Sequence, residues 1–580
     1  MNNMGNDFIE YLNSMNNANS CNKNALAESQ VLDDYYDDIK ITRKLGDILY
    51  EKLFNSNPIG VILTGHAGDG KTSILIQILE KIGYFSKGKK PLKESELYNE
   101  KLFYVKDMSE LNEENQKSML KKFLKYPNKN ISSLLVSNTG PLINTFGNIL
   151  DKDSSEQLEI NLLNRLDRND LESIEIEIDG EICTFIAVNM ANIDNTYLVK
   201  DIMTNLLKET LWEKCMNCEV KEKCPIAFNY NICSKNMDRI VNILEQIYTW
   251  FKENESRLTI RQMISHISFA LTGNLTCKEI NNYIIYKKDV LFDYAFPNLL
   301  FGYKGIQQIS ESLNIKAIKE LNKISIDQNA LPMDYQLFVR EEFEMFDEEV
   351  KFILEEKLKQ NQNDLGVNSN DATRLRRAFR RFYILISKID DDEFDKLKES
   401  IFSEAFNIYY KLSNDEIITH KEKSKLKDIV FEGLYKTFIG VYPKDENTLY
   451  LTVKKELDEI QNVQLILGEV PKKDISIKNV LKECSLREND SKYEIILNFS
   501  RCNYDVRLTF QMLQYFMKIG EGEIFTTLNP SFTFGLNSLK AKLLRSYRYD
   551  EDAEINLLVI NKNKPDNISF IIENGKMEVL

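Results

Sequence analysis

Apolar residues follow two different periods in the first third of the chain. Short apolar runs of strand length lie at Ile59–Thr64, Leu102–Val105, Leu134–Val136 and Phe185–Val188. Longer segments between them carry apolar residues at helical spacing, as in residues 73–82. Continuous apolar runs are typical of strands that are buried on both faces, and their alternation with helices favours an α/β core with a parallel sheet.

The segment Ile174–Ile182 has the alternating pattern of a half-exposed strand and contains Asp179-Gly180 near its centre. Because Asp-Gly suits the tight turns that join antiparallel strands, this segment predicts a β-hairpin. One continuous helix is expected over Ile39–Phe54, just before the first strand of the core.

The second half of the chain changes from helical to strand-like spacing. Residues 236–430 are mostly helical in period, and strand-like runs return at Leu449–Val453, Tyr493–Leu497, Ile555–Ile560 and Ser569–Ile572. A chain of 580 residues exceeds what one hydrophobic core supports, so several domains are expected. We predict a mobile N-terminal arm at 1–38, an α/β core at 39–204, a Cys-rich insert at 205–235, a helical lid and helical region at 236–430, and an α+β domain at 431–580.

The loop after the first predicted strand carries the strongest chemical signal. Residues 65–72 read G-x-x-x-x-G-K-T, the pattern of a phosphate-binding P-loop, between a predicted strand and a predicted helix. Lys71 can reach the β- and γ-phosphates, and the Thr72 hydroxyl can ligate Mg²⁺. We therefore expect a P-loop NTPase that uses ATP and Mg²⁺. The expected nucleotide-contacting residues are Gly65, His66, Ala67, Gly68, Asp69, Gly70, Lys71, Thr72 and Ser73.

Polar residues follow the other core strands, at the end where ligands bind in α/β sheets. Asp107 is the candidate second Mg²⁺ carboxylate, with a helix N-cap as the alternative role. Glu110 is the candidate residue that orients or deprotonates the attacking water. Asn138 resembles a γ-phosphate-sensing residue, and Asn189 is its rival for that role. Turn formation is the alternative for both asparagines.

Arginines outside the core suggest two further roles. Arg261 lies in a predicted amphipathic helix where an ATPase lid often supplies a cation to the phosphates; an ordinary surface arginine is the alternative. Farther on, an apolar stripe of Leu375, Phe379, Phe382 and Ile386 predicts a helix whose arginines project outward, where they could bind DNA phosphates or an acidic partner. A solvated face paired with nearby carboxylates is the alternative. These arginines are Arg374, Arg376, Arg377, Arg380 and Arg381.

Four of the nine cysteines fall within nineteen residues, as Cys215, Cys218, Cys224 and Cys233. A C-x-x-C pair opens the set, and four thiolates fit a tetrahedral structural Zn²⁺ site. An Fe–S cluster is the alternative metal centre. Buried thiols without a metal are a third interpretation, because free cysteine is commonly buried.

Composition and charge exclude several function classes. The net charge of −14 argues against nucleic-acid binding over the whole surface. The three histidines are far apart in sequence, and no nuclease constellation is evident. There is no apolar run of membrane-spanning length and no secretory signal at the start, so we expect a cytoplasmic protein with reduced thiols and no membrane partner.

The chain resembles the DptF family, ATPase-like subunits of bacterial restriction systems that are paired with DNA phosphorothioation. The likeness rests on Gly65–Thr72, Val105–Leu111, Leu135–Gly140, Val188–Asp194 and the cysteine cluster that ends in residues 224–226. The resemblance implies an AAA+-type ATPase that acts with partner subunits in phage defence against DNA lacking the sulfur modification. DNA contact is then expected mainly through the complex, with Arg374, Arg377 and Arg381 as candidate contacts.

Two alternatives remain open beside this interpretation. Asp107 is not followed directly by Glu, in contrast to the common AAA+ pattern, which brings efficient hydrolysis into question. A STAND-type signalling ATPase, which switches oligomeric state on nucleotide binding, therefore remains an alternative. An enzyme with its own nuclease in the C-terminal region is the second, weaker alternative.

Overall fold

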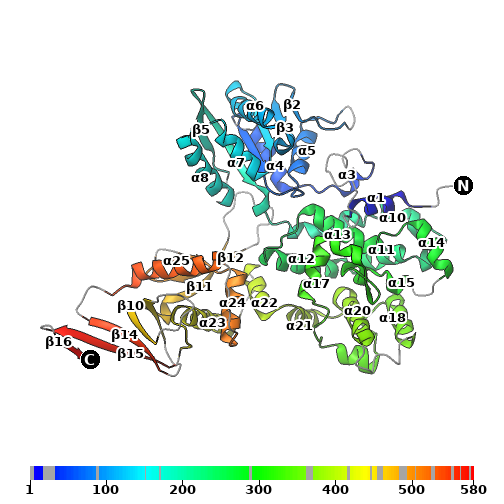
Figure 1. The fold of residues 1–580 in the computed structure, drawn as a ribbon. Coiled ribbons are helices and arrows are strands. Elements are labelled where there is room, and N and C mark those ends of the chain that lie inside the picture. The colour runs from blue at the N-terminus through cyan, green and yellow to red at the C-terminus, as the bar shows by residue number, and fades with distance from the viewer. Residues whose placement is uncertain are drawn as a thin grey trace. The chain divides into compact units, whose positions relative to one another are not determined.

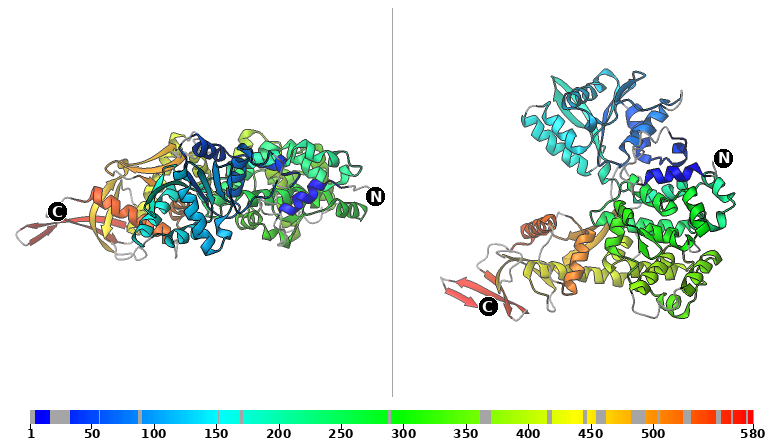
Figure 2. Two further views of the ribbon diagram at one scale, coloured as in Figure 1. Left: turned by 90° about the horizontal axis from the view of Figure 1, so that it is seen from above. Right: turned by 45° about the vertical axis from the view of Figure 1, so that its right-hand side comes forward.

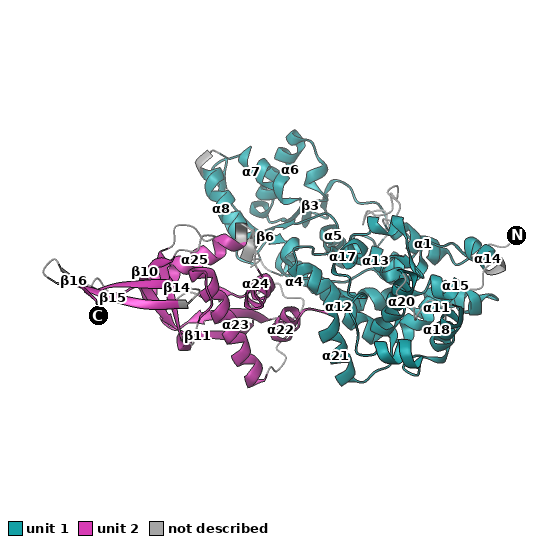
Figure 3. Ribbon diagram, turned by 60° about the horizontal axis from the view of Figure 1, so that its bottom comes forward, with its two compact units in different colours: residues 1–401, 484–489 teal, residues 402–483, 490–580 magenta. Residues whose placement is uncertain are grey.

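The computed structural model divides the chain into two compact units, residues 1–401 with 484–489 and residues 402–483 with 490–580 (Figure 3). The boundary near residue 401 lies earlier along the chain than the predicted boundary at 430. The residues that the structure describes are 5–16, 33–55, 57–86, 90–150, 152–168, 171–286, 290–360, 370–414, 419–443, 447–453, 462–481, 493–502, 505–523, 530–549, 554–561, 564–573 and 576–579.

The first unit contains a six-stranded sheet in the order β2-β3-β4-β1-β6-β5. The central strands β3, β4, β1 and β6 run parallel, and β2 and β5 pair antiparallel at the two edges. The predicted mixed α/β core with a parallel sheet is therefore confirmed. The strands are β1 (Gly60–Thr64), β2 (Ser95–Tyr98), β3 (Leu102–Val105), β4 (Ser132–Val136), β5 (Ile174–Ile178) and β6 (Glu181–Asn189).

Helices cover both faces of this sheet (Figure 1). Val61 and Leu63 of β1 join one apolar cluster with helices α4 and α5, whereas Ile62 joins a second cluster with α6, α7 and α8. This split follows from the period of two along a strand, which sends neighbouring side chains to opposite faces. The helices are α4 (Lys44–Phe54), α5 (Lys71–Lys81), α6 (Glu113–Lys125), α7 (Thr139–Gly147) and α8 (Lys152–Arg168).

Two local predictions before and within the core have different outcomes. The hairpin is confirmed, because β5 and β6 pair through a turn in which Asp179 and Gly180 both have positive φ.

The prediction of one continuous helix over Ile39–Phe54 is wrong, because the helix is interrupted between α3 (Tyr36–Ile39) and α4. The Gln77 side chain accepts from the backbone N–H of Arg43 at 3.0 Å and donates to its carbonyl at 2.9 Å. These two bonds hold Arg43 in an extended conformation in place of helical hydrogen bonds.

A helical layer follows the sheet in the first unit (Figure 1 and Figure 2). Helix α13 is buried along most of its length and contacts α1, α9, α11, α16 and α17. None of the helices in the described parts of the chain has the length and apolar character needed to cross a membrane. The layer comprises α9 (Val199–Leu206), α10 (Glu209–Met216), α11 (Pro225–Lys235), α12 (Met237–Glu253), α13 (Ile260–Thr272), α14 (Cys277–Tyr286), α15 (Val290–Asp293), α16 (Phe296–Leu300), α17 (Lys316–Ile324), α18 (Glu348–Gln360), α20 (Asn370–Ile386) and α21 (Asp391–Ile401).

The N-terminal segment is not a mobile arm where the structure describes it. Helix α1 (Asp7–Met15) packs on α13, and its residues Phe8 and Leu12 have no exposed surface. The ring of Phe8 also meets the edge of Trp212 on α10, with centroids 5.8 Å apart. The prediction of a mobile arm over 1–38 is therefore wrong for this part, because the short amphipathic helix buries its apolar face; residues 17–32 lie outside the described residues.

The second unit is α+β. Its five-stranded sheet has the order β16-β15-β14-β10-β9, and a smaller sheet has the order β11-β12-β13. Helices α23 and α24 pack closely, because a Cβ atom at Gly433 would lie 2.4 Å from the Phe516 ring. The elements are α22 (Glu404–Ser413), α23 (His420–Ile439), β9 (Thr448–Val453), β10 (Val463–Pro471), β11 (Ile475–Leu481), β12 (Tyr493–Phe499), β13 (Val506–Arg507), α24 (Phe510–Gly520), α25 (Pro530–Tyr547), β14 (Glu554–Asn561), β15 (Lys564–Glu573) and β16 (Lys576–Val579).

Candidate nucleotide-binding site

The Gly-rich loop connects β1 to α5 at the carboxyl end of the parallel strands. Gly70 is the N-cap of α5 and has a φ of 87°, in the left-handed region that glycine adopts without strain. Gly65 has a φ of 140°, and a Cβ atom there would lie 3.0 Å from the backbone nitrogen of Ala191. Both positions therefore require glycine, and together they direct the chain from the strand into the N-terminus of α5.

Lys71 is held inside the loop. Its side-chain amine donates to the carbonyl oxygens of Gly65 and His66, each at 2.9 Å, and to Oδ1 of Asn138 at 3.1 Å. Burial lowers the pKa of Lys71, an effect that the nearby carboxylates of Asp107 and Asp69 oppose. The loop, β4 and β3 therefore bring their polar groups together around one lysine.

Asp107 and Glu110 follow β3 and differ in their surroundings. Asp107 is half-buried, and its Oδ1 accepts from the backbone N–H of Ser109 at 2.9 Å, so it caps the short helix η2 (Met108–Glu110). The alternative role as an N-cap is thus present, while the charge of Asp107 still acts on Lys71. Glu110 is exposed and lies 4.0 Å from the amine of Lys106.

Small polar side chains connect the ends of the central strands. The backbone N–H of Asn138 donates to the Ser109 hydroxyl at 2.7 Å, and the hydroxyls of Thr64 and Thr139 are 2.8 Å apart. These bonds fix Asn138 beside Lys71. The side chain of Asn189 instead accepts from the backbone N–H of Ala191 at 3.0 Å, as the N-cap of the turn after β6.

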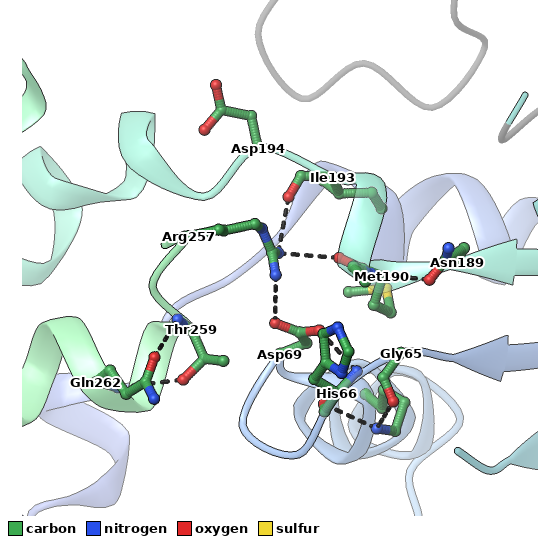
Figure 4. Close-up of polar contacts among 12 residues, drawn as sticks. Gly65, His66, Asp69, Asn189, Met190, Ile193, Asp194, Arg257, Thr259 and Gln262 are labelled. Atoms are coloured by element: carbon green, nitrogen blue, oxygen red, sulfur yellow. Dashed lines mark hydrogen bonds and ion pairs between the residues drawn. The ribbon is translucent and has the colours of Figure 1, made fainter. Parts of the chain in front are cut away.

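Asp69, in the middle of the loop, has no exposed surface and is fully engaged (Figure 4). Its Oδ2 accepts from the backbone N–H of His66 at 2.9 Å, and its Oδ1 lies 2.8 Å from Nη1 of Arg257. Nη2 of Arg257 also donates to the carbonyls of Met190 and Ile193, at 3.0 and 2.8 Å. Arg257 therefore ties the loop to the segment after β6 and to the residues that precede α13.

The N-terminus of α13 lies directly on the loop. Thr259 and Gln262 form a capping box that begins the helix, with bonds of 3.3 and 2.9 Å (Figure 4). A Cβ atom at Gly68 would lie 2.9 Å from the Thr259 hydroxyl and 3.4 Å from Cβ of Arg261. Arg261 is close enough for its charge to act on Lys71. The structure therefore places the predicted lid cation beside the loop.

Three residues of this site were not predicted from the sequence, and each comes from a different element. Arg257 pairs with Asp69, Ser109 anchors Asn138, and the buried guanidinium of Arg43 donates to the Asp69 carbonyl at 3.2 Å. The only sequence hint for Arg257 is weak: it lies two residues before Thr259, which begins the capping box of α13. No sequence pattern indicates Arg43, because its partner lies across the fold.

The cysteine prediction needs a correction at its fourth residue. Cys224 is the N-cap of α11 and Cys233 lies near the end of the same helix, nine residues later. This separation corresponds to about 13 Å along the helix axis, too far for two ligands of one ion. Cys233 is fully buried, and burial alone raises its pKa. In the part of the chain that is described, no three His, Cys, Asp or Glu side chains converge to hold a metal ion as they stand.

The arginine helix α20 also differs from prediction. Its apolar stripe is buried as expected, but Arg381 is only 1% exposed and its Nε lies 2.7 Å from Oδ2 of Asp327. Arg377 reaches the other oxygen of Asp327 at 3.0 Å, and Arg380 pairs with Asp334 at 2.6 Å. The expectation that all five arginines point outward is wrong, because the loop that carries these aspartates covers their face. Arg374 remains exposed, beside Asp371.

Comparison with known proteins adds no family assignment. No family model matches the sequence, and no curated protein matches it significantly.

Proposed function

We propose that the chain is a P-loop NTPase that binds ATP with Mg²⁺ at the loop Gly65–Thr72. The observation that supports this best is the position of Lys71, whose amine lies within the curve of the loop and contacts Asn138 from the neighbouring strand. A glycine-rich turn that leads into a helix N-terminus suits a phosphate group, and a buried lysine there supplies the compensating charge.

The surrounding side chains have the chemistry that the cofactor needs. The Thr72 hydroxyl and the Asp107 carboxylate would hold Mg²⁺, and Lys71 with Arg261 would neutralise phosphate charge. Asn138 would contact the terminal phosphate. Glu110 is the candidate for orienting water, and its exposed position agrees with slow hydrolysis or with activation by a partner.

Contacts between the loop and the helical layer would couple nucleotide binding to movement of the helices. Asp69 and Gly68 contact Arg257 and the start of α13, so a nucleotide that moves the loop also acts on that helix. A ligand shifts an equilibrium only by its different affinity for the two states, and in a switch these contacts would have to differ between the states. They favour the second candidate function, a nucleotide-controlled switch of the STAND type.

For the biological role, we propose an ATP-binding subunit of a DNA restriction complex in phage defence, on the strength of the DptF resemblance. DNA contact would come mainly from partner subunits, because Arg377 and Arg381 are engaged with Asp327. Co-purification with other subunits of a phosphorothioation-dependent system would support this role. Assembly triggered by a ligand other than DNA would support the switch.

Calorimetric titration of the full chain with ATP and Mg²⁺ tests the nucleotide site. We expect Lys71→Ala to abolish measurable binding. Lys81→Ala is the matched control, because Lys81 ends the same helix and is paired with Asp47 on the surface. Equal ATP affinity in the Lys71→Ala variant and the wild type would refute the assignment.

A further inference from the structure

Three cysteines lie in a compact series of turns that runs from the last turn of α10 to the N-cap of α11. The backbone N–H of Cys218 donates to the carbonyl of Cys215 at 3.2 Å, and the N–H of Lys221 donates to the carbonyl of Cys218 at 3.2 Å. The N–H of Cys224 then donates to the carbonyl of Lys221 at 3.1 Å. These consecutive turns fold the C-x₂-C-x₅-C segment back on itself and keep its three thiols in one neighbourhood.

A fourth cysteine reaches the same neighbourhood from a distant part of the sequence. Cys277 is the first residue of α14, and a Cβ atom at Gly5 would lie 3.8 Å from its sulfur. The next residue, Asn6, donates from Nδ2 to the sulfur of Cys215 at 3.4 Å. Because consecutive Cα atoms are about 3.8 Å apart, Cys277 and Cys215 flank the same dipeptide.

The electrostatics of the thiols agree with this placement. The pKa of Cys215 is raised to about 12, mainly by burial; the hydrogen bond from Asn6 opposes this shift, and the neighbouring thiols of Cys224, Cys277 and Cys218 contribute to it. Burial also raises the pKa of Cys224, with added effects from Cys277 and Cys218, while the N–H groups of residues 226 and 227 lower it. Cys233 has no part in this group, since burial is the only cause of its raised pKa.

We propose that Cys215, Cys218, Cys224 and Cys277 form a four-thiolate metal site that fastens α14 to α10 and α11 beside the N-terminal segment. This site does not depend on the proposed nucleotide function. Zn²⁺ and Fe–S clusters share this ligand set. The thiols do not converge as they stand, so binding includes rotation about the χ1 bond, the only side-chain torsion between cysteine Cα and sulfur. Each thiol loses its proton to solvent as its sulfur joins the metal, so affinity falls with falling pH.

The location gives the site a structural role. Helix α1 follows Gly5 and Asn6 directly and packs on α13, the helix whose other end contacts the phosphate loop. A metal that holds Cys215 and Cys277 in place would therefore also support Gly5 and Asn6, which lie against them, and through these residues the packing of α1 on α13. Four thiolates leave no open coordination position, so a structural metal is expected in place of a catalytic one.

Metal analysis of the full chain, purified without chelators from cells supplied with zinc and iron, tests the proposal. We expect about one zinc per chain, or iron with an absorbance band in the visible, which separates the two metal centres. Cys277→Ser should lose the metal, and Cys233→Ala should retain the wild-type amount. Wild-type protein without metal, or loss in Cys233→Ala with retention in Cys277→Ser, would overturn the proposal.

Thiol alkylation of the wild-type protein keeps the test independent of a folding defect in Cys277→Ser. Cys218 and Cys277 are partly exposed, so their reaction reports on ligation. We expect mass spectrometry to find both thiols protected, and both modified once a chelator has removed the metal. Immediate modification of Cys277 in metal-containing protein would overturn its assignment as a ligand.

Discussion

Arg257 and Asp69 form an ion pair of 2.8 Å that connects the residues before α13 to the centre of the Gly-rich loop, residues 65–72. Asp69 has no exposed surface, and the Arg257 side chain is 19% exposed. A buried carboxylate next to bound phosphates would repel them, and Arg257 neutralises it. The pair attaches the helical layer to the loop, and in the proposed nucleotide site it would also serve ATP binding.

Removing Arg257 should weaken ATP binding, because Asp69 then keeps an uncompensated charge beside the phosphates. We expect Arg257→Ala to lower affinity about tenfold, or roughly 1.4 kcal/mol. Asp69→Asn in the Arg257→Ala background should restore part of the loss, because the unpaired charge is gone. A double-mutant cycle measured by ATP titration gives the coupling. Additive effects of the two substitutions would show that the pair does not act on the nucleotide.

Asp107 can be tested without disturbing its role as a helix cap. Asp107→Asn keeps an oxygen that can accept from Ser109 but removes the charge that would attract Mg²⁺. We expect ATP affinity in the presence of Mg²⁺ to fall about tenfold, with little change in EDTA. Glu110→Gln is the control, since it should affect hydrolysis and leave binding intact. An unchanged Mg²⁺ dependence in Asp107→Asn would place the metal carboxylate elsewhere.

We expect Arg381 to contribute to the stability of the folded state and not to DNA binding. Its partner Asp327 is 1% exposed, so Arg381→Ala leaves a buried carboxylate with one cation fewer. We expect local destabilisation of about 3 kcal/mol, and less than about 0.5 kcal/mol for the exposed control Arg374→Ala. Hydrogen exchange of the α20 amides measures both without assuming two-state unfolding. Equal protection in the two variants would contradict the buried pairing.

His266 should be neutral in the folded protein. Its Nε2 lies 2.8 Å from the Leu300 carbonyl, which requires a donor, and its Nδ1 lies 2.8 Å from the Tyr248 hydroxyl, which can then donate. Burial lowers the pKa of His266 to about 4, although the Leu300 carbonyl opposes the shift. Between pH 6.5 and 4 the unfolded chain therefore binds a proton that the folded chain does not.

The folded state should accordingly lose stability as the pH falls through this window, by about 3 kcal/mol in total from this residue. Histidine C2 hydrogen–deuterium exchange, followed by mass spectrometry, reads the pKa of His266 directly. A pKa near 6.5 would show that the ring is hydrated. His266→Gln should reduce the pH dependence of α13 amide exchange over the same range.

Local sequence patterns predicted the elements that position the candidate nucleotide site. The apolar runs before Gly65, Asp107 and Asn138 became parallel strands, because a strand buried on both faces has a continuous apolar sequence. The turn at Asp179-Gly180 was likewise predicted from adjacent residues alone. Sequence spacing alone therefore placed the loop and the ends of β3 and β4.

Contacts between distant segments could not be predicted in this way. Arg257 meets Asp69 across 188 residues, and Arg381 meets Asp327 across 54. Helical spacing put Arg381 on the polar side of α20, but spacing carries no information on which loop covers that side. Counting cysteines in the sequence likewise included Cys233 in a four-cysteine motif. In the structure, the length of α11 separates Cys233 from Cys224.

Chemical labelling of Lys71 tests the central claim most directly. An acyl phosphate derivative of ATP transfers its acyl group to a lysine amine beside the terminal phosphate, with release of ATP. The account predicts labelling of Lys71, identified by mass spectrometry of the digested full chain and suppressed by excess ATP. Labelling confined to surface lysines such as Lys81, with no protection by ATP, would contradict it.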